Sequence, residues 1–128
     1  MIKYHAYKDY YVLDEKISVQ TDIKISKVIR NKHSSMSRAG RITLFPGFIW
    51  DGATGAIDTP DVMEASAFHD FCCNEYNNGN LTKEQRKQAD QMFKGLLKKQ
   101  SVWSLRVKWM YQAVRKFFET KEWFKRVF

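Results

Sequence analysis

Three side chains in this sequence have the types and spacing of a water-activating site: His69, Asp70 and Asp90. His69 and Asp70 are adjacent in a stretch with helical periodicity, and Asp90 lies in the next such stretch. If the two stretches form a hairpin around residues 78–80, His69 and Asp90 lie at nearly equal distances from the turn, so we expect them to face each other. A carboxylate that orients an imidazole, beside a second carboxylate able to bind a cation, is typical of hydrolases that activate water.

Both members of the expected pair lie on apolar helix faces. His69 shares its face with a set of mostly small or apolar residues: Val62, Ala65, Ser66, Cys72, Cys73 and Tyr76. Asp90 has Arg86, Phe93 and Leu97 at helical spacing. A carboxylate on a packed face is costly unless it is hydrogen-bonded, and His69 is the partner that this geometry offers. A buried pair that only pins two helices together, without chemistry, is equally consistent with these two residues.

Two further acids predict a cation site. Asp70 is rotated toward the helix edge, and Asp51 lies in the glycine-rich loop before the helix, from which it can approach Asp70. Two carboxylates and the backbone carbonyls around Gly52 are hard oxygen ligands, which suit Ca²⁺ better than zinc. The alternative is that Asp51-Gly52 is only a turn dipeptide and that Asp70 is only solvated.

The sequence predicts that these residues are positioned by the strands and helices of one α+β domain over residues 1–128. Residues 1–57 are strand-rich and are expected to form short antiparallel strands. The expected strands are Ile2–Ala6, Tyr10–Leu13, Ile17–Val19, Ile23–Ile29 and Arg41–Ile49, the last broken at Pro46-Gly47. Within Ile23–Ile29 we expect Ile23, Ile25 and either Val28 or Ile29 to point inward. Asn31–Gly40 is predicted to be a polar loop, and Trp50–Gly55 a glycine-punctuated turn.

Residues 58–128 are predicted to be helical and to carry the His-Asp motif. Thr59-Pro60-Asp61 starts a helix that runs to about Asn77, with Gly79 as the stop signal. Thr82 and Gln85 predict a capping box that opens a second, antiparallel helix to about Lys99. A third, amphipathic helix, capped by Ser101, is expected from Val102 to Phe118, and a short fourth from Lys121 to Val127. The third would cover the hairpin with Val102, Leu105, Trp109, Met110, Ala113 and Phe117.

The charge distribution predicts an anionic partner for the C-terminal helices. The net charge is +8, and residues 82–128 carry 13 Lys and Arg against 4 Asp and Glu. Aromatic residues alternate with these cations in residues 103–128. Basic, aromatic helices can lie on an anionic membrane surface. The other candidates are an acidic face of another protein and nucleic acid, although no nucleic-acid recognition motif accompanies the charge.

Other features limit the remaining alternatives. The first 19 residues contain no apolar run long enough for a signal peptide or a membrane span, so we expect synthesis in the cytoplasm without a signal peptide. Cys72 and Cys73 are expected to be reduced core residues that do not pair with each other. Zinc bound by His5, His33 and the cysteines has no supporting ligand spacing. A metal phosphohydrolase with His33 as a ligand is disfavoured by the strand-rich first half.

Three runs carry a family resemblance. They are Gly47-Phe48-Ile49-Trp50-Asp51-Gly52-Ala53-Thr54, then Ala67-Phe68-His69-Asp70-Phe71, then Ala89-Asp90-Gln91-Met92-Phe93. In this order they resemble domain-of-unknown-function family 1353, small proteins of tailed bacteriophages and prophages, over roughly residues 40–115. This resemblance implies a phage protein made in the host cytoplasm, which can be incorporated in the virion and can bind other phage structural proteins.

The same pieces more distantly resemble prokaryotic secreted phospholipase A2. That resemblance implies that His69 is the general base, that Asp90 fixes its tautomer, and that Asp70, Asp51 and the Gly52 region bind Ca²⁺ in an ester hydrolase acting at the bacterial envelope. Ala53 and Ser66 stand where those enzymes have half-cystines, as loss of a disulfide in reducing cytosol would require. The non-enzymatic alternative is a virion structural or assembly protein in which the His-Asp pair is a structural pin and the basic, aromatic C-terminus binds a partner.

Overall fold

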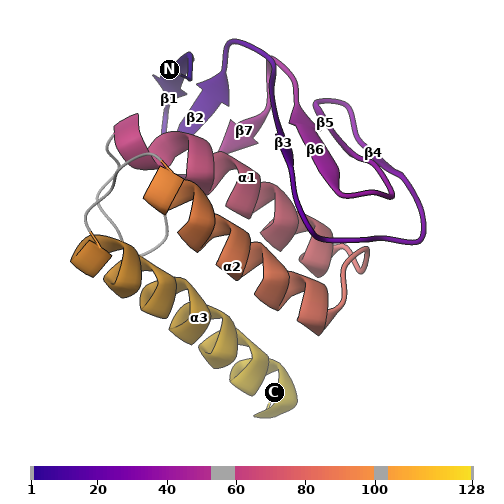
Figure 1. Ribbon diagram of the computed structural model, residues 1–128, viewed down its shortest axis with the longest axis vertical. Helices are drawn as coiled ribbons and strands as arrows, with labels where there is room; N and C mark the ends of the chain where they lie inside the picture. The colour runs from indigo at the N-terminus through magenta and orange to yellow at the C-terminus, as the bar shows by residue number, and fades with distance from the viewer. Residues whose placement is uncertain (1, 53–59, 100–103, 128) are drawn as a thin grey trace.

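Strands form the first half of the chain and helices the second, which confirms the predicted α+β class. A computed structural model describes residues 2–52, 60–99 and 104–127 (Figure 1). The described strands are β1 (Tyr4–Tyr7), β2 (Tyr10–Leu13), β3 (Ile17–Gln20), β4 (Ile29–Arg30), β5 (Ser34–Met36), β6 (Arg41–Leu44) and β7 (Ile49–Trp50). The described helices are α1 (Pro60–Asn77), α2 (Lys83–Lys99) and α3 (Ser104–Val127).

The strands form two small antiparallel sheets beside the helices. One has the order β1-β2-β7 and the other β3-β6-β5-β4. Figure 1 shows α1 next to the strands, α2 beyond it and α3 outermost. Helix α1 is therefore buried on both sides, and Phe68 and Phe71 on it pack in one core with Trp50, Leu13 and Ile42. A second core cluster, which includes Phe93 and Met110, joins the three helices.

The turn between α1 and α2 fixes where α1 ends and α2 begins, and so determines which residues of the two helices lie opposite each other. Gly79 has a φ of 83°, and its N–H donates to the carbonyl of Tyr76 while the Asn80 N–H donates to Glu75, as in a Schellman motif. The predicted capping box opens α2. The Thr82 N–H donates to Oε1 of Gln85 at 2.8 Å, and the Gln85 N–H donates to Oγ1 of Thr82 at 3.1 Å.

Two predictions for the strand half are wrong in detail. Ile23, Ile25 and Ile29 are buried as expected and Val28 is exposed, but only Ile29 of this segment is in a strand. The backbone of residues 23–28 is not part of a strand ladder; the Ile25 N–H, for example, donates to the carbonyl of Arg38. The predicted loop 31–40 contains strand β5, which pairs with both β4 and β6. The small polar residues of β5 do not have the sequence pattern of a strand. The predicted break at Pro46-Gly47 is confirmed, because β6 ends before it and β7 begins after it.

Two predictions for the third helix are also wrong. Helix α3 is continuous through residues 118–121, where the sequence has no glycine or proline to end it. Its buried face holds Val107, Met110 and Val114, whereas Leu105 and Trp109 are 79% and 56% exposed. The helix is thus rotated relative to the expected face. Thr59, Ser101 and Val102 lie outside the described residues.

Gly40 offers a test of the strand half. Its φ is 98°, and a Cβ atom there would lie 2.4 Å from the Ile23 carbonyl oxygen. We expect Gly40→Ala to lower the free energy of unfolding by more than about 1 kcal/mol in urea titrations. Gly95 is the matched control because nothing lies within 4 Å of its added Cβ. Gly95→Ala in helix α2 should raise stability by about 0.5–1 kcal/mol, and an equal loss in both variants would contradict this account of Gly40.

Candidate active site

The structure brings His69 and Asp90 together as the spacing predicts. Nε2 of His69 lies 2.5 Å from Oδ1 of Asp90, across the interface between α1 and α2. Asp90 is completely buried and His69 is 7% exposed. The His69 ring also packs against Phe93, with 4.8 Å between ring centroids. The imidazole is therefore held by a hydrogen bond on one edge and an aromatic ring on one face.

Two arginines share the same carboxylate. Nη1 of Arg86, one turn earlier on α2, donates to Oδ1 of Asp90 and lies 3.3 Å from Nε2 of His69. Nη1 of Arg115, on α3, donates to Oδ2 of Asp90 at 2.8 Å. Sequence spacing could have identified Arg86, which precedes Asp90 by one helical turn. Nothing in the sequence points to Arg115, because its contact depends on how α3 crosses the hairpin.

Burial and these charges move both pKa values of the pair. Burial alone would raise the pKa of Asp90, but the His69 hydrogen bond and the charges of His69 and Arg86 hold it below its ordinary value. Burial alone would lower the pKa of His69, but the electrostatic interaction with Cys73 and the hydrogen bond to Asp90 raise it to about 9. The pair therefore favours an imidazolium next to a carboxylate at neutral pH.

The second ring nitrogen of His69 faces away from Asp90. Nδ1 lies 3.7 Å from the Sγ atom of Cys73, one helical turn further along α1. Cys72 and Cys73 are both free thiols, as predicted; Cys72 is buried and Cys73 is partly exposed. The sequence places Cys73 on the histidine face, but its role as the neighbour of Nδ1 was not anticipated.

Asp51 lies close enough to Asp70 for its negative charge to act on the Asp70 carboxyl. The pKa of Asp70 is raised to about 6. Partial burial is the largest cause, and the negative charge of Asp51 is the second. Asp51 is exposed at the end of β7. Trp50, the residue before it, donates its Nε1–H to Oγ of Ser66 on α1 at 3.1 Å. This bond ties the start of the loop to α1, one helical turn before Asp70.

The donors fit calcium in type. Asp51 and Asp70 offer carboxylate oxygens, and Gly52, with a φ of 91°, offers its backbone carbonyl. Within residues 2–52, 60–99 and 104–127, no group of three or more His, Cys, Asp or Glu side chains has the arrangement of a metal site. A calcium ion here would thus need backbone oxygens as well as the two carboxylates. Residues 53–59, including Ala53, lie outside the described part.

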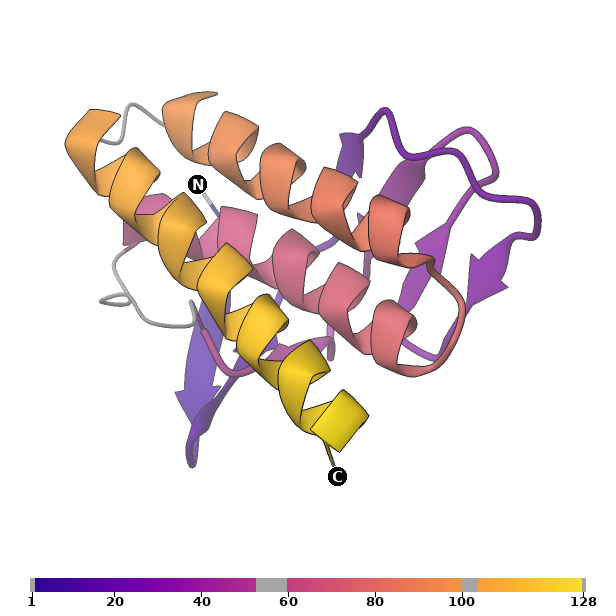
Figure 2. The same cartoon turned by 90° about the horizontal axis from the view of Figure 1, so that it is seen from below.

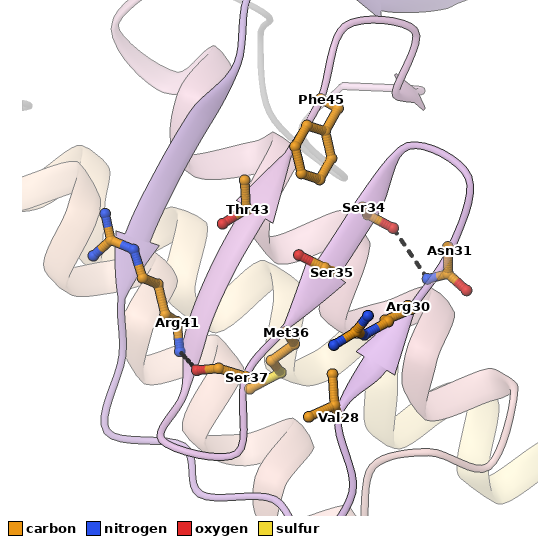
Figure 3. A pocket seen from close by; sticks show the side chains of 10 residues that line it. All are labelled: Val28, Arg30, Asn31, Ser34, Ser35, Met36, Ser37, Arg41, Thr43 and Phe45. Atoms are coloured by element: carbon orange, nitrogen blue, oxygen red, sulfur yellow. Dashed lines mark hydrogen bonds between the residues drawn. The ribbon is translucent and has the colours of Figure 1, made fainter.

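A surface pocket lies on the strands, away from the His69 site. Figure 3 shows a pocket of about 470 Å³ on the outer face of β4, β5 and β6. Ser35 and Thr43 form its floor between the longer side chains of Arg30 and Arg41 (Figure 3). None of the residues that line it is acidic or a histidine. It shares no residue with the His69 site and cannot supply the predicted chemistry.

Comparison with known proteins supports the family resemblance. No curated protein and no solved structure matches the chain. The model of one family, described as "Protein of unknown function (DUF1353)", matches residues 46–114. This range includes Asp51, Asp70, His69 and Asp90, and it agrees with the expected extent of residues 40–115. The chain therefore belongs to the DUF1353 family of proteins of unknown function.

Proposed function

We propose that this protein is a calcium-dependent ester hydrolase of the phospholipase A2 kind, in which His69 is the proton acceptor. The observation that carries the proposal is the 2.5 Å contact between Nε2 of His69 and Asp90, which leaves Nδ1 on the opposite edge of the ring. Asp90 fixes the tautomer with the proton on Nε2, so that Nδ1 can accept a proton from the attacking nucleophile in the fraction of molecules whose imidazole is neutral, and this fraction grows as the pH rises toward 9. The same contact holds the ring orientation during turnover.

Asp51, Asp70 and the backbone around Gly52 would hold the cation. When bound, Ca²⁺ would polarise the ester carbonyl and stabilise the developing oxyanion. The repulsion that raises the pKa of Asp70 supports this assignment, because a divalent cation between the two carboxylates would relieve it.

The proposed substrate is a phospholipid of the bacterial envelope, and the proposed source is a bacteriophage. The outer surface of α3 supports a membrane partner, since Leu105 and Trp109 are exposed there beside Lys108 and Lys116. No helix in the described ranges is long and apolar enough to cross a membrane. We propose that the protein is made in the host cytoplasm and acts at the lipid surface, either free or carried in the virion with other phage structural proteins.

The proposal is tested with vesicles of phosphatidylethanolamine and phosphatidylglycerol. We expect purified protein with Ca²⁺ to release free fatty acid, measured by mass spectrometry, and EGTA to stop the release. Vesicles of neutral phosphatidylcholine are the control for the basic surface, and Trp109→Ala should weaken binding to the anionic vesicles. If no fatty acid is released from any vesicle at saturating calcium, the phospholipase proposal is wrong.

One observation favours a second candidate, the non-enzymatic virion or assembly protein. Asp90 accepts hydrogen bonds from Arg86 and Arg115 in addition to its contact with His69, so its carboxylate joins all three helices. Such a network is sufficient as a structural pin. In this case the basic surface of α3 would bind a phage structural protein or nucleic acid, and His69 variants would change stability only.

The cation site makes a separate prediction for stability. Asp70→Asn should raise the free energy of unfolding at pH 7 in EGTA by about 1–3 kcal/mol, because it removes a carboxylate whose pKa is raised to about 6. The raised pKa means that this destabilisation is absent below pH 4 and develops as the pH rises through 6. Calcium at about 100 times its Kd should then stabilise the wild type by about 2.7 kcal/mol and the variant not at all. Equal calcium effects on both proteins in thermal melts would contradict the site.

A further inference from the structure

Cys73 lies where a nucleophile would lie. It follows His69 by one turn of α1, and its Sγ is 3.7 Å from Nδ1, while Asp90 holds Nε2. Thiol, imidazole and carboxylate thus form one chain of contacts in the order that nucleophilic catalysis requires. We propose that Cys73 is the nucleophile of this hydrolase and forms an acyl-thioester. This inference rests on the proposed function and adds a covalent step to it.

The neighbouring cysteine provides the contrast. Cys72 points into the core with no exposed surface, and burial raises the pKa of its thiol well above the usual range. Cys73 is partly exposed and borders a small cavity of about 40 Å³ between α1, α2 and the second half of α3. Figure 2 shows α3 crossing the hairpin, and the contacts of Tyr76 with Phe118 and Glu122 place this half against the end of α1. Of the two adjacent thiols, only Cys73 is open to a substrate.

The cavity limits what can enter. Besides Cys73 it is bordered by Tyr76, Asn77, Arg86, Phe118, Lys121 and Glu122. Glu122 accepts a hydrogen bond from the Tyr76 hydroxyl at 2.5 Å, which closes one side. A volume of about 40 Å³ accepts the carbonyl end of an ester or a short acyl group, so an acetyl ester is a suitable probe.

The covalent step balances with ester and water as the only reactants. Starting from neutral His69, Sγ of Cys73 attacks the carbonyl carbon while its proton passes to Nδ1. The C–S bond forms, the C–O bond to the alcohol breaks, and the leaving alkoxide takes the proton from Nδ1. Water then attacks the thioester and gives its proton to Nδ1, the C–S bond breaks, and the proton returns to sulfur. No oxidant or reductant is needed.

The test is acyl transfer from p-nitrophenyl acetate, quenched in acid and mapped by peptide mass spectrometry. We expect acetyl on Cys73, formed faster in the native protein than in the same chain unfolded in urea, and removed by hydroxylamine. His69→Gln should slow this acetylation by about 100-fold or more. Cys72→Ala is the matched control and should acetylate like the wild type. Because trapping uses the wild type, its result does not depend on whether a Cys73 variant folds.

The failures of the two proposals are distinguishable. If folded Cys73→Ala still releases fatty acid from vesicles at the wild-type rate, water attacks directly and the covalent inference is overturned, while the hydrolase stands. If Cys73 is acetylated no faster in the native than in the unfolded chain, the inference is also overturned. If Cys73 is acetylated rapidly but no ester turns over, the thiol is the nucleophile and the proposed hydrolase is contradicted.

Discussion

Replacing Asp90 with alanine is expected to lower the free energy of unfolding by about 3–5 kcal/mol. Asp90 is completely buried and contacts His69, Arg86 and Arg115. Its removal leaves three cationic groups at the junction of α1, α2 and α3 without their common anion. Few single substitutions cost this much, and the mechanism here is a broken buried ion-pair network.

Urea titrations at pH 7 measure this effect, and two variants give it a scale. Asp22→Ala changes an exposed aspartate and should alter stability by no more than about 0.5 kcal/mol. Asp90→Asn keeps the shape and one oxygen acceptor but removes the charge, so we expect an intermediate loss. A loss below about 1 kcal/mol for Asp90→Ala would show that the carboxylate does not hold the three helices together.

Stability should also fall as the pH rises from about 6.5 to 9. The pKa of His69 is raised from 6.5 to about 9 in the folded protein, so the folded chain binds a proton that the unfolded chain has lost. The stabilisation is fully present below pH 6.5 and is lost as the pH passes through 9. Its size is on the order of 3 kcal/mol, taken from the size of this shift. Urea titrations between pH 6.5 and 9 measure it.

His69→Gln is the control because it keeps the packing but cannot titrate. The variant should be nearly insensitive to pH over this interval. Asp70, whose pKa in the folded protein is about 6, affects stability mainly below pH 6.5 and so below the window. Buried Cys72 lies above it, because its pKa is raised beyond the value of 9.0 for an ordinary cysteine. A wild type whose stability is flat, or rises, between pH 6.5 and 9 would contradict the imidazolium and carboxylate pairing.

The sequence predicted the parts of the site that lie on one hairpin. His69 and Asp90 could be paired because Gly79 and the Thr82 capping box fix where α1 ends and α2 begins. These two points determine how far each residue lies from the turn along its helix. Helical periodicity then decided which side chains face each other. These are local signals, and in this protein they agree with the global fold.

The parts that could not be predicted depend on packing between distant segments. Arg115 reaches Asp90 only because α3 crosses the hairpin at a particular angle, and no turn or cap encodes that angle. The exposure of Leu105 and Trp109 has the same origin, since an amphipathic pattern does not fix helix rotation when one face is mixed. Strand β5 was missed because its pairing with β4 and β6, rather than side-chain alternation, holds it.

The most direct test of the central claim, that His69 and Asp90 perform chemistry, compares the wild type with His69→Gln. Both are assayed for fatty-acid release from anionic vesicles with calcium, at equal concentrations of folded protein verified by circular dichroism. We expect the wild type to turn over and His69→Gln to lose activity by about 10²–10⁴-fold while remaining folded. Equal rates in the two folded proteins would contradict the claim and leave the pair as a structural pin.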